Sequence, residues 1–167
     1  MKLLIISDTH QDTKTMEQVI QHHKEVDMII HCGDSELEFS YFEDKPIYVV
    51  RGNCDFDSQF PEEQVLKVED EIVYVTHGHK HKVKSTLMPL SYRAQELAAS
   101  IVCFGHSHLI GAEMNNGVLF VNPGSLHQPR GRKEKSYAIV EKFKDGWNVF
   151  FYSSEHIIIE NIILKFY

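Results

Sequence analysis

The first half of the chain alternates between apolar runs and polar segments. Three continuous apolar runs suit strands buried on both faces of a sheet, and they are residues 2–6, 28–31 and 47–50. After the first run, apolar residues recur at the spacing of one helical face, and Asp12 or Thr13 can cap that helix. A short polar helical segment is expected before Pro46. This order predicts a parallel sheet with polar groups gathered at its carboxyl edge.

The second half reads as short strands joined by turns, with one helix among them. Its first strands are predicted at residues 64–68, 72–76, 101–104, 111–114 and 118–121. Apolar residues between 90 and 98 mark the helical face. Residues 136–143 and 147–152 predict a further hairpin that covers the second sheet, and the apolar tail 157–167 fits either a strand or a helix.

Length and composition limit the class of protein. The 167 residues fit one domain, 1–167, with a core of its own. Seventeen basic against 24 acidic residues give a net charge of −7, which argues against a nucleic-acid surface built on bulk charge. We expect a cytoplasmic protein, because neither a leader peptide nor a membrane-spanning run is evident. Three cysteines without a Cys-x-x-Cys pair indicate neither a disulfide framework nor a structural zinc site.

Five predicted strand ends carry side chains that bind metals. They are Asp8-Thr9-His10, Gly33-Asp34, Gly52-Asn53, His77-Gly78-His79 and Gly105-His106-Ser107-His108. Each alone fits a polar turn, and His31, His22 and His23 are expected to be ordinary packed or surface residues. Burying so many polar groups without partners would cost about 1 to 3 kcal/mol for each group. Together they therefore indicate a metal site at the sheet edge.

The donor types restrict the metal. Imidazole, carboxylate and amide oxygen without thiolate suit Mn, Fe, Co, Ni or Zn, and they argue against calcium. Two such ions lying about 3.5 to 4 Å apart need a bridging carboxylate, and Asp34, flanked by glycine, is the candidate. Two divalent ions would make the site locally positive and able to attract phosphate in an acidic protein.

The motif series resembles that of the calcineurin-like metallophosphoesterases over residues 7–125. With its short length and Asn122-Pro123-Gly124-Ser125, the chain is similar to the small YfcE-like bacterial and archaeal phosphodiesterases, a group related to the Vps-type retromer subunit. The resemblance implies a four-layer α/β sandwich with two facing mixed β-sheets. It also implies one metal held by Asp8, His10 and His108, a second held by Asn53, His77 and His106, and Asp34 as the bridge.

Two departures from the family pattern bear on activity. Cys54 stands where many relatives have histidine after Gly-Asn, and a thiol is a poorer proton donor to the leaving alkoxide. Phosphoesters with good leaving groups should therefore be favoured. Ser35-Glu36-Leu37 also departs from the Asp-Arg continuation found in protein phosphatases, which weakens that interpretation.

The sequence thus predicts a metal-dependent phosphodiesterase with two divalent ions, expected to be Mn²⁺, and a bridging hydroxide acting on a small phosphoester. Asn53, Cys54 and Asp55 are the catalytic candidates, since the Asn53 and Cys54 amides can hold phosphate oxygens and Asp55 can orient the site. His79 is either a substrate contact or a supporting residue, and Arg130 is the substrate candidate of a basic cluster at 130–135. A phosphomonoesterase and a non-catalytic, retromer-like scaffold are the alternatives. The oligomeric state stays open.

Overall fold

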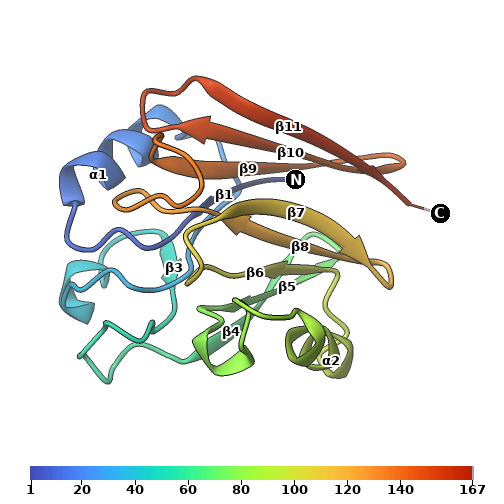
Figure 1. Ribbon diagram of the computed structural model, residues 1–167, viewed down its shortest axis with the longest axis horizontal. Helices are drawn as coiled ribbons and strands as arrows, with labels where there is room; N and C mark the ends of the chain where they lie inside the picture. The colour runs from blue at the N-terminus through green and yellow to red at the C-terminus, as the bar shows by residue number, and fades with distance from the viewer. Residues whose placement is uncertain (167) are drawn as a thin grey trace.

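The computed structural model describes residues 1–166 as two β-sheets that face one another, with one α-helix on each outer side (Figure 1). Tyr167, the last residue of the apolar tail, lies outside the described residues. The elements are β1 (Lys2–Ile6), α1 (Thr13–His22), β2 (Met28–His31), η1 (Phe39–Tyr41), β3 (Ile47–Val49), β4 (Glu63–Val68), β5 (Glu71–Thr76), η2 (His79–His81), α2 (Met88–Glu96), β6 (Ile101–Cys103), β7 (Ile110–Asn115), β8 (Val118–Pro123), β9 (Ser136–Phe143), β10 (Gly146–Ser153) and β11 (Ile158–Lys165).

Both sheets are mixed. The six-stranded sheet has the order β11-β10-β9-β1-β2-β3, with β1, β2 and β3 parallel and β9 to β11 antiparallel to their neighbours. The five-stranded sheet has the order β4-β5-β6-β8-β7, in which β5, β6 and β8 are parallel. This architecture confirms the predicted sandwich of two facing mixed sheets.

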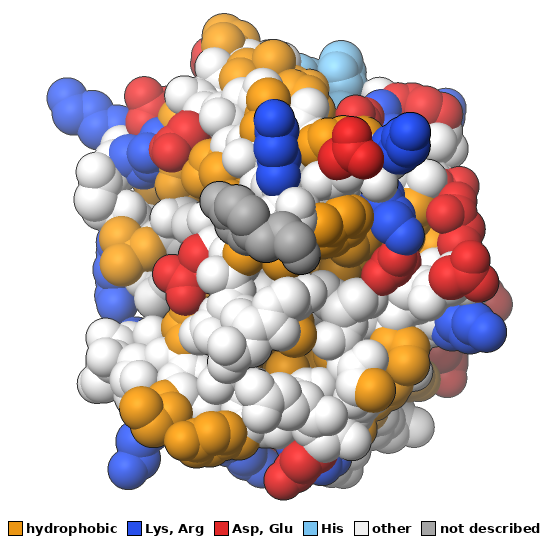
Figure 2. Space-filling view, turned by 90° about the vertical axis from the view of Figure 1, so that its right-hand side faces the viewer, with side chains coloured by type: hydrophobic (Ala, Val, Ile, Leu, Met, Phe, Trp, Pro, Cys, Tyr) orange, Lys and Arg blue, Asp and Glu red, His pale blue; other side chains and the backbone are white. Residues whose placement is uncertain are grey.

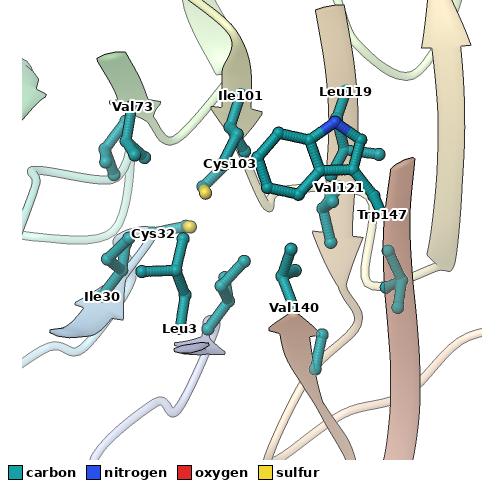
Figure 3. Close-up of a cluster of buried hydrophobic side chains, with 14 of the residues drawn as sticks. Leu3, Ile30, Cys32, Val73, Ile101, Cys103, Leu119, Val121, Val140 and Trp147 are labelled. Atoms are coloured by element: carbon teal, nitrogen blue, oxygen red, sulfur yellow. The ribbon is translucent and has the colours of Figure 1, made fainter. Parts of the chain in front are cut away.

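The main core fills the space between the sheets. Leu3, Ile30 and Cys32 of the six-stranded sheet point toward Val73 and Cys103 of the other sheet, as Figure 3 shows. All five side chains are fully buried, and both cysteines are free thiols. Burial on this inner face explains why β1 and β2 read as continuous apolar runs, because their outer faces are covered as well.

The two helices cover the outer faces through their apolar stripes. Met16 and Val19 of α1 pack in a cluster with Leu4 and Ile6 of β1. On the other side, Leu90 and Ala94 of α2 pack with residues of β5, β6 and β8, namely Tyr74, Val102 and Phe120. Helix, sheet, sheet and helix make four layers, as the resemblance implied.

The hairpin of β9 and β10 covers one face of the five-stranded sheet, as predicted, but it does so as part of the six-stranded sheet. The pairing that the sequence did not predict is that of β9 with β1, in the register Leu3 to Val140. The inner face of the hairpin packs against the five-stranded sheet through Val140 and Trp147. The apolar tail is the edge strand β11, paired with β10.

Polar loops occupy one end of the sandwich. The carboxyl ends of β1, β2 and β3 lie at the left of Figure 1. The opposite end, seen face-on in Figure 2, carries intermingled acidic and basic side chains with small hydrophobic areas between them. Within residues 1–166, no helix is long and apolar enough to cross a membrane.

Candidate metal centre

The five strand ends singled out in the sequence converge at the carboxyl edges of the two sheets. Asp8 follows β1, Asp34 follows β2 and Asn53 follows β3 in the six-stranded sheet, whereas His77 follows β5 and His108 follows β6 in the other sheet. The backbone is left-handed at Asp8, Asp34 and His108, with φ of 52°, 57° and 60°. Non-glycine residues rarely adopt this conformation, and such strain collects at functional sites.

Two glycines of the motifs let these segments approach one another. A Cβ atom at Gly105 would lie 2.1 Å from Ser7 Oγ and 2.6 Å from Asp8 Oδ2. A Cβ at Gly52 would lie 2.0 Å from Asp34 Oδ1. Any larger residue would push an aspartate out of the centre, which gives the Gly-Asn and Gly-His pairs a steric reason.

The first donor group consists of Asp8, His10 and His108, which each offer one ligand atom within 4.8 Å of the others. His108 Nε2 lies 3.0 Å from Asp8 Oδ1, and His10 Nε2 lies 4.0 Å from the same oxygen. The other ring nitrogens are held from outside: His108 Nδ1 donates to Gln128 O at 2.6 Å, and His10 Nδ1 donates to Glu36 Oε1 at 2.5 Å. Anchoring one ring nitrogen so that the other faces the centre is the usual arrangement around metal-binding histidines.

The second donor group consists of Asp8, Asp34 and His77, again within 4.8 Å. His77 Nδ1 donates to Cys32 O at 2.7 Å, and its Nε2 lies 3.3 Å from Asp34 Oδ2 and 3.9 Å from Asp8 Oδ1. Asn53 Oδ1 lies 3.1 Å from the same nitrogen. Asp8 belongs to both groups, so two ions bound here would be neighbours.

His106 borders the second group without joining it. Its backbone N–H donates to Asp8 Oδ2 at 3.1 Å, and its ring centroid lies 5.1 Å from that of His77. Within residues 1–166, the compact donor groups do not include the His106 ring. The structure therefore brings the predicted ligands to one place, with the His106 ring at the margin.

Neighbouring histidines and backbone amides keep the two carboxylates of the centre ionised. Burial alone would raise the pKa of Asp34, but hydrogen bonds from His77 and from the Cys54 amide hold that pKa well below its usual value. The pKa of Asp8 is also lowered overall, because His108 and His77 outweigh its burial. The bond with Asp8 raises the pKa of His108. Both carboxylates are consequently ionised at neutral pH.

The donor set fits divalent transition metals. Buried carboxylates and buried or half-buried imidazoles meet at one place, which suits Mn, Fe, Co, Ni or Zn. His10 Nε2 is buried and has no hydrogen-bond partner among the described residues, although its ring is anchored by Glu36. An unpartnered buried nitrogen is costly, and a metal ion would satisfy it.

Asp55 was predicted to orient the site, and the structure places it behind the centre, against the backbone of the loops that carry the ligands. It is buried, and its carboxylate accepts backbone N–H groups of Gly52 at 2.7 Å, Asp34 at 2.8 Å and Glu36 at 2.7 Å. Both oxygens thus bind the loops that follow β2 and β3. Asp55 holds Asp34 and Asn53 in position through the backbone.

Cys54 also differs from its expected role. Its backbone N–H donates to Asp34 Oδ1 at 2.8 Å, so this amide binds the proposed bridge and not a substrate oxygen. Burial and the neighbouring Asp34 carboxylate raise the pKa of the thiol to about 11. The thiol is therefore protonated at neutral pH, which argues against a nucleophilic role.

His79 and Arg130 lie at the margin of the centre. The ring of His79 is half-buried with its centroid 5.4 Å from that of His77, a position that suits either a substrate contact or a supporting residue. The backbone N–H of Arg130 donates to His108 O at 3.1 Å, which places this exposed residue at the edge. In the same basic segment, Arg132 pairs with Glu160 and Lys135 with Asp12.

Sequence reasoning missed several supporting residues. Glu36 anchors His10, and the Ser125 hydroxyl donates to Asp8 O at 2.7 Å. Asn122 Nδ2 donates to Gly105 O at 3.0 Å, which joins the Asn-Pro-Gly-Ser loop to the last histidine motif. The sequence holds one signal for Glu36: it is a carboxylate two residues after Asp34, at the point where the chain departs from the family pattern.

Comparison with known proteins agrees with this geometry. The model of the calcineurin-like phosphoesterase superfamily domain matches residues 1–145. The probable metallophosphoesterase YsnB of Bacillus subtilis is 45% identical over 163 residues, covering 97% of this chain and 96% of that protein. The phosphodiesterase YfcE of Escherichia coli is 27% identical over 169 residues, covering 84% of this chain and 88% of that protein.

Solved structures show the same fold. A crystal structure from Streptococcus pneumoniae, described as that of a predicted phosphoesterase, has a TM-score of 0.92 and 34% identity and covers 98% of this chain and 97% of its own. Vps29 from Entamoeba histolytica, complexed with zinc, has a TM-score of 0.75 at 18% identity and covers 98% of this chain and 99% of its own. At that identity, the likeness to Vps29 concerns the fold alone.

Proposed function

Because this chain belongs to the calcineurin-like phosphoesterase superfamily and is a metal-dependent phosphoesterase, we propose that it hydrolyses small phosphodiesters at the centre between its two sheets. Two divalent ions would bind there, Mn²⁺ in preference to Zn, Ni, Fe or Co. Asp8, His10 and His108 would hold one ion, Asn53, His77 and His106 would hold the other, and Asp34 would bridge them.

One observation carries the two-ion proposal. Asp8 is shared by two compact donor groups, one completed by His10 and His108 and the other by Asp34 and His77. A single ion needs only one such group. Two groups with a common carboxylate provide two adjacent positions, as two-metal hydrolases require. Asp34 belongs to the second group alone, so its role as the bridge rests on the family motif and not on this observation.

The protein's own residues prepare the centre for phosphate. When bound, divalent ions would supply Lewis-acid polarisation of phosphate and activation of water near neutral pH. Asp55 and Glu36 fix the ligands from outside the centre, so little rearrangement is needed on binding. Asn53 is exposed beside His77, where its amide can reach both an ion and a phosphate oxygen.

Leaving-group preference follows from Cys54. Its thiol stands next to the proposed bridge, with a pKa raised to about 11 by burial and by Asp34. Such a thiol is a weak general acid, and a well-placed acid typically contributes about 10² to 10⁴ in rate. We propose that aryl and other activated diesters are turned over faster than alkyl diesters.

Two other functions remain to be separated from this one. A phosphomonoesterase would use the same centre, and the reason to prefer a diesterase is that several relatives, YfcE among them, are named phosphodiesterases. A scaffold without catalysis would match the fold of Vps29. The ionised carboxylates and the unpartnered His10 Nε2 favour a metal centre in either case.

The test is a metal-supplemented hydrolysis screen over mono-, di- and cyclic phosphoesters that share one leaving group. Chain stripped of metal would be reloaded with Mn²⁺, Zn²⁺, Ni²⁺, Co²⁺ or Fe²⁺, and bound ions would be counted in each sample. Two ions per chain with higher kcat/KM for diesters support the proposal. Two bound ions without hydrolysis of any activated ester would favour the scaffold.

A further inference from the structure

Three histidines gather on the outer face of the six-stranded sheet, apart from the centre described above. His22 ends α1, His23 is the C-cap of that helix, and His156 lies in the turn between β10 and β11. Figure 1 shows this turn beside α1, and the ring centroids of His22 and His156 are 3.8 Å apart. His23 was expected on the surface, but its side chain is buried.

The three rings offer nitrogen atoms that lie within 4.8 Å of one another. The rings of His22 and His156 are stacked with an interplanar angle of 1°. Bonds of about 2.0 to 2.1 Å to a tetrahedral ion place its nitrogen ligands roughly 3.3 Å apart. Reaching that spacing takes a contraction of up to about 1.5 Å. One ring must also turn out of the parallel stack, since the nitrogen lone pairs lie in the ring planes, and His22 is exposed and able to turn.

Tyr137 supports the cluster from beneath. Its hydroxyl lies 2.8 Å from His23 Nε2 and 3.0 Å from His156 Nδ1, so one residue of β9 orients two rings. These two bonds leave His23 Nδ1 and His156 Nε2 as the nitrogens that can bind an ion. A hydrogen-bonding partner behind an imidazole is what fixes metal-binding histidines in other proteins.

The turn that carries His156 is itself held in an uncommon conformation. His156 has a φ of 65°, and its backbone N–H donates to Ser153 O at 2.8 Å. Ser153 N–H in turn donates to Ile157 O at 2.8 Å. A histidine is thus kept in the left-handed region, where glycine is preferred, and this places its ring against His22.

We propose that His22, His23 and His156 form a second metal site that binds one Zn²⁺ ion, separate from the phosphoesterase centre. Three imidazoles without a required carboxylate favour Zn²⁺, Ni²⁺ or Cu²⁺ over Mn²⁺ and Mg²⁺. A fourth position opens onto a groove lined by Glu17 and Glu155, where water can complete the coordination. Binding joins the end of α1 to the β10–β11 turn.

Burial affects the pKa of two of the three histidines. Burial, followed by the charge of His22, lowers the pKa of His23 to about 4. Burial and His22 also lower the pKa of His156.

The experiment counts zinc per chain in metal-stripped protein after loading with excess Zn²⁺ and desalting. The variant His22→Asn/His156→Asn should retain one ion fewer than wild type, and Gln18→Ala, in the same groove, should retain the wild-type number. With Mn²⁺, all three proteins should retain equal numbers. An unchanged zinc count in the double variant would overturn the proposal.

A second measurement uses the wild-type protein, so it does not depend on whether the double variant folds. Long-range ¹H–¹⁵N spectra of the wild-type histidines, recorded during a Zn²⁺ titration, should show the nitrogens of His22, His23 and His156 shifting together. Resonances of these three that stay fixed would refute the site. Mn²⁺-supported diester hydrolysis by the double variant should equal that of wild type, so a failure of this inference is distinguishable from a failure of the proposed function.

Discussion

The Asp55 carboxylate accepts the backbone N–H of Asp34 at 2.8 Å, and this bond connects two loops that follow neighbouring strands. The same carboxylate accepts from Gly52 at 2.7 Å. Asp34 and Asn53 therefore share one support. Removing it should loosen the loops on both sides without touching the faces that meet the ions.

Asp55→Ala should lower the affinity for divalent ions by about 10- to 100-fold, as is typical when a group behind a metal ligand is lost. Asp55→Asn should lower it less, because one amide oxygen can still accept an N–H. Metal affinity would be measured by calorimetry. Asp57→Asn is the control, since Asp57 lies in the same loop and accepts the backbone N–H groups of Phe39 in η1 and of Gln59. Equal affinities in wild type and Asp55→Ala would contradict the positioning role.

Glu36 should affect metal binding through its bond to His10. Glu36→Ala removes the acceptor of His10 Nδ1, so the ring is free to turn, and metal affinity should fall by about 10-fold or more. Glu36→Gln keeps an acceptor oxygen and should recover most of that loss. Glu38→Ala, at an exposed position nearby, serves as the control. A loss of the same size in Glu36→Ala and Glu36→Gln would mean that the negative charge matters and the orientation does not.

Asp34→Ala should abolish hydrolysis and reduce the bound ions from two to one or none, because Asp34 is the proposed bridge. Elemental analysis of metal-loaded protein measures the number, and circular dichroism checks the fold. Asp44→Ala changes an exposed carboxylate and should alter neither quantity. Retention of both ions by Asp34→Ala would refute the bridge.

Cys54→His should raise turnover of alkyl diesters more than that of aryl diesters, since only a poor leaving group needs a proton donor. The gain is expected within about 10- to 100-fold, below the full contribution of an optimally placed acid. Parallel kcat measurements on the two classes give the answer. Cys54→Ser should leave the ratio of the two rates unchanged. A uniform change in both rates with histidine would show that no proton donor is missing.

Asp12 should stabilise α1 in a pH-dependent manner. Its side chain accepts the Thr15 N–H at 3.1 Å and pairs with Lys135 at 2.7 Å. Although burial opposes it, these partners lower the pKa of Asp12 from 3.8 to about 2. Because the folded protein has the lower pKa, this contribution is present above about pH 4 and is lost as the pH falls toward about 2.

Asp12→Ala should therefore reduce the free energy of unfolding by about 1 kcal/mol at pH 7, the usual value of a helix N-cap. The difference from wild type should shrink as the pH is lowered below 4, measured by urea unfolding at each pH. Asp12→Asn keeps a side-chain oxygen that can cap the helix, so its free energy of unfolding should fall less than that of Asp12→Ala. A difference between Asp12→Ala and wild type that is independent of pH would contradict ionisation as the cause.

Local patterns predicted most strands and the residues at their ends, because continuous apolar runs and flanking glycines are properties of short segments. The placement of β9 was missed, since its pairing with β1 joins residues as distant as Leu3 and Val140. The tail was ambiguous because its isoleucines follow no single period, and β11 is an edge strand with partly exposed apolar residues. Pairing between distant strands leaves no local signal.

The supporting residues were hidden for a different reason. Glu36 reaches His10 from a backbone with φ of 54°, and Asp55 turns toward the backbone of the loops and away from the ligands. Residue type and spacing identify groups that can bind a metal. The direction of each side chain depends on loop conformation, which the sequence pattern does not contain.

The bond from His106 N–H to Asp8 Oδ2 spans 98 residues and connects the two sheets. Contacts between such distant segments form late, because a long loop must close before they are made. Ions whose ligands come from both sheets bind only when the two sheets are packed together. Bound metal should therefore slow the unfolding of the protein and leave its folding rate unchanged.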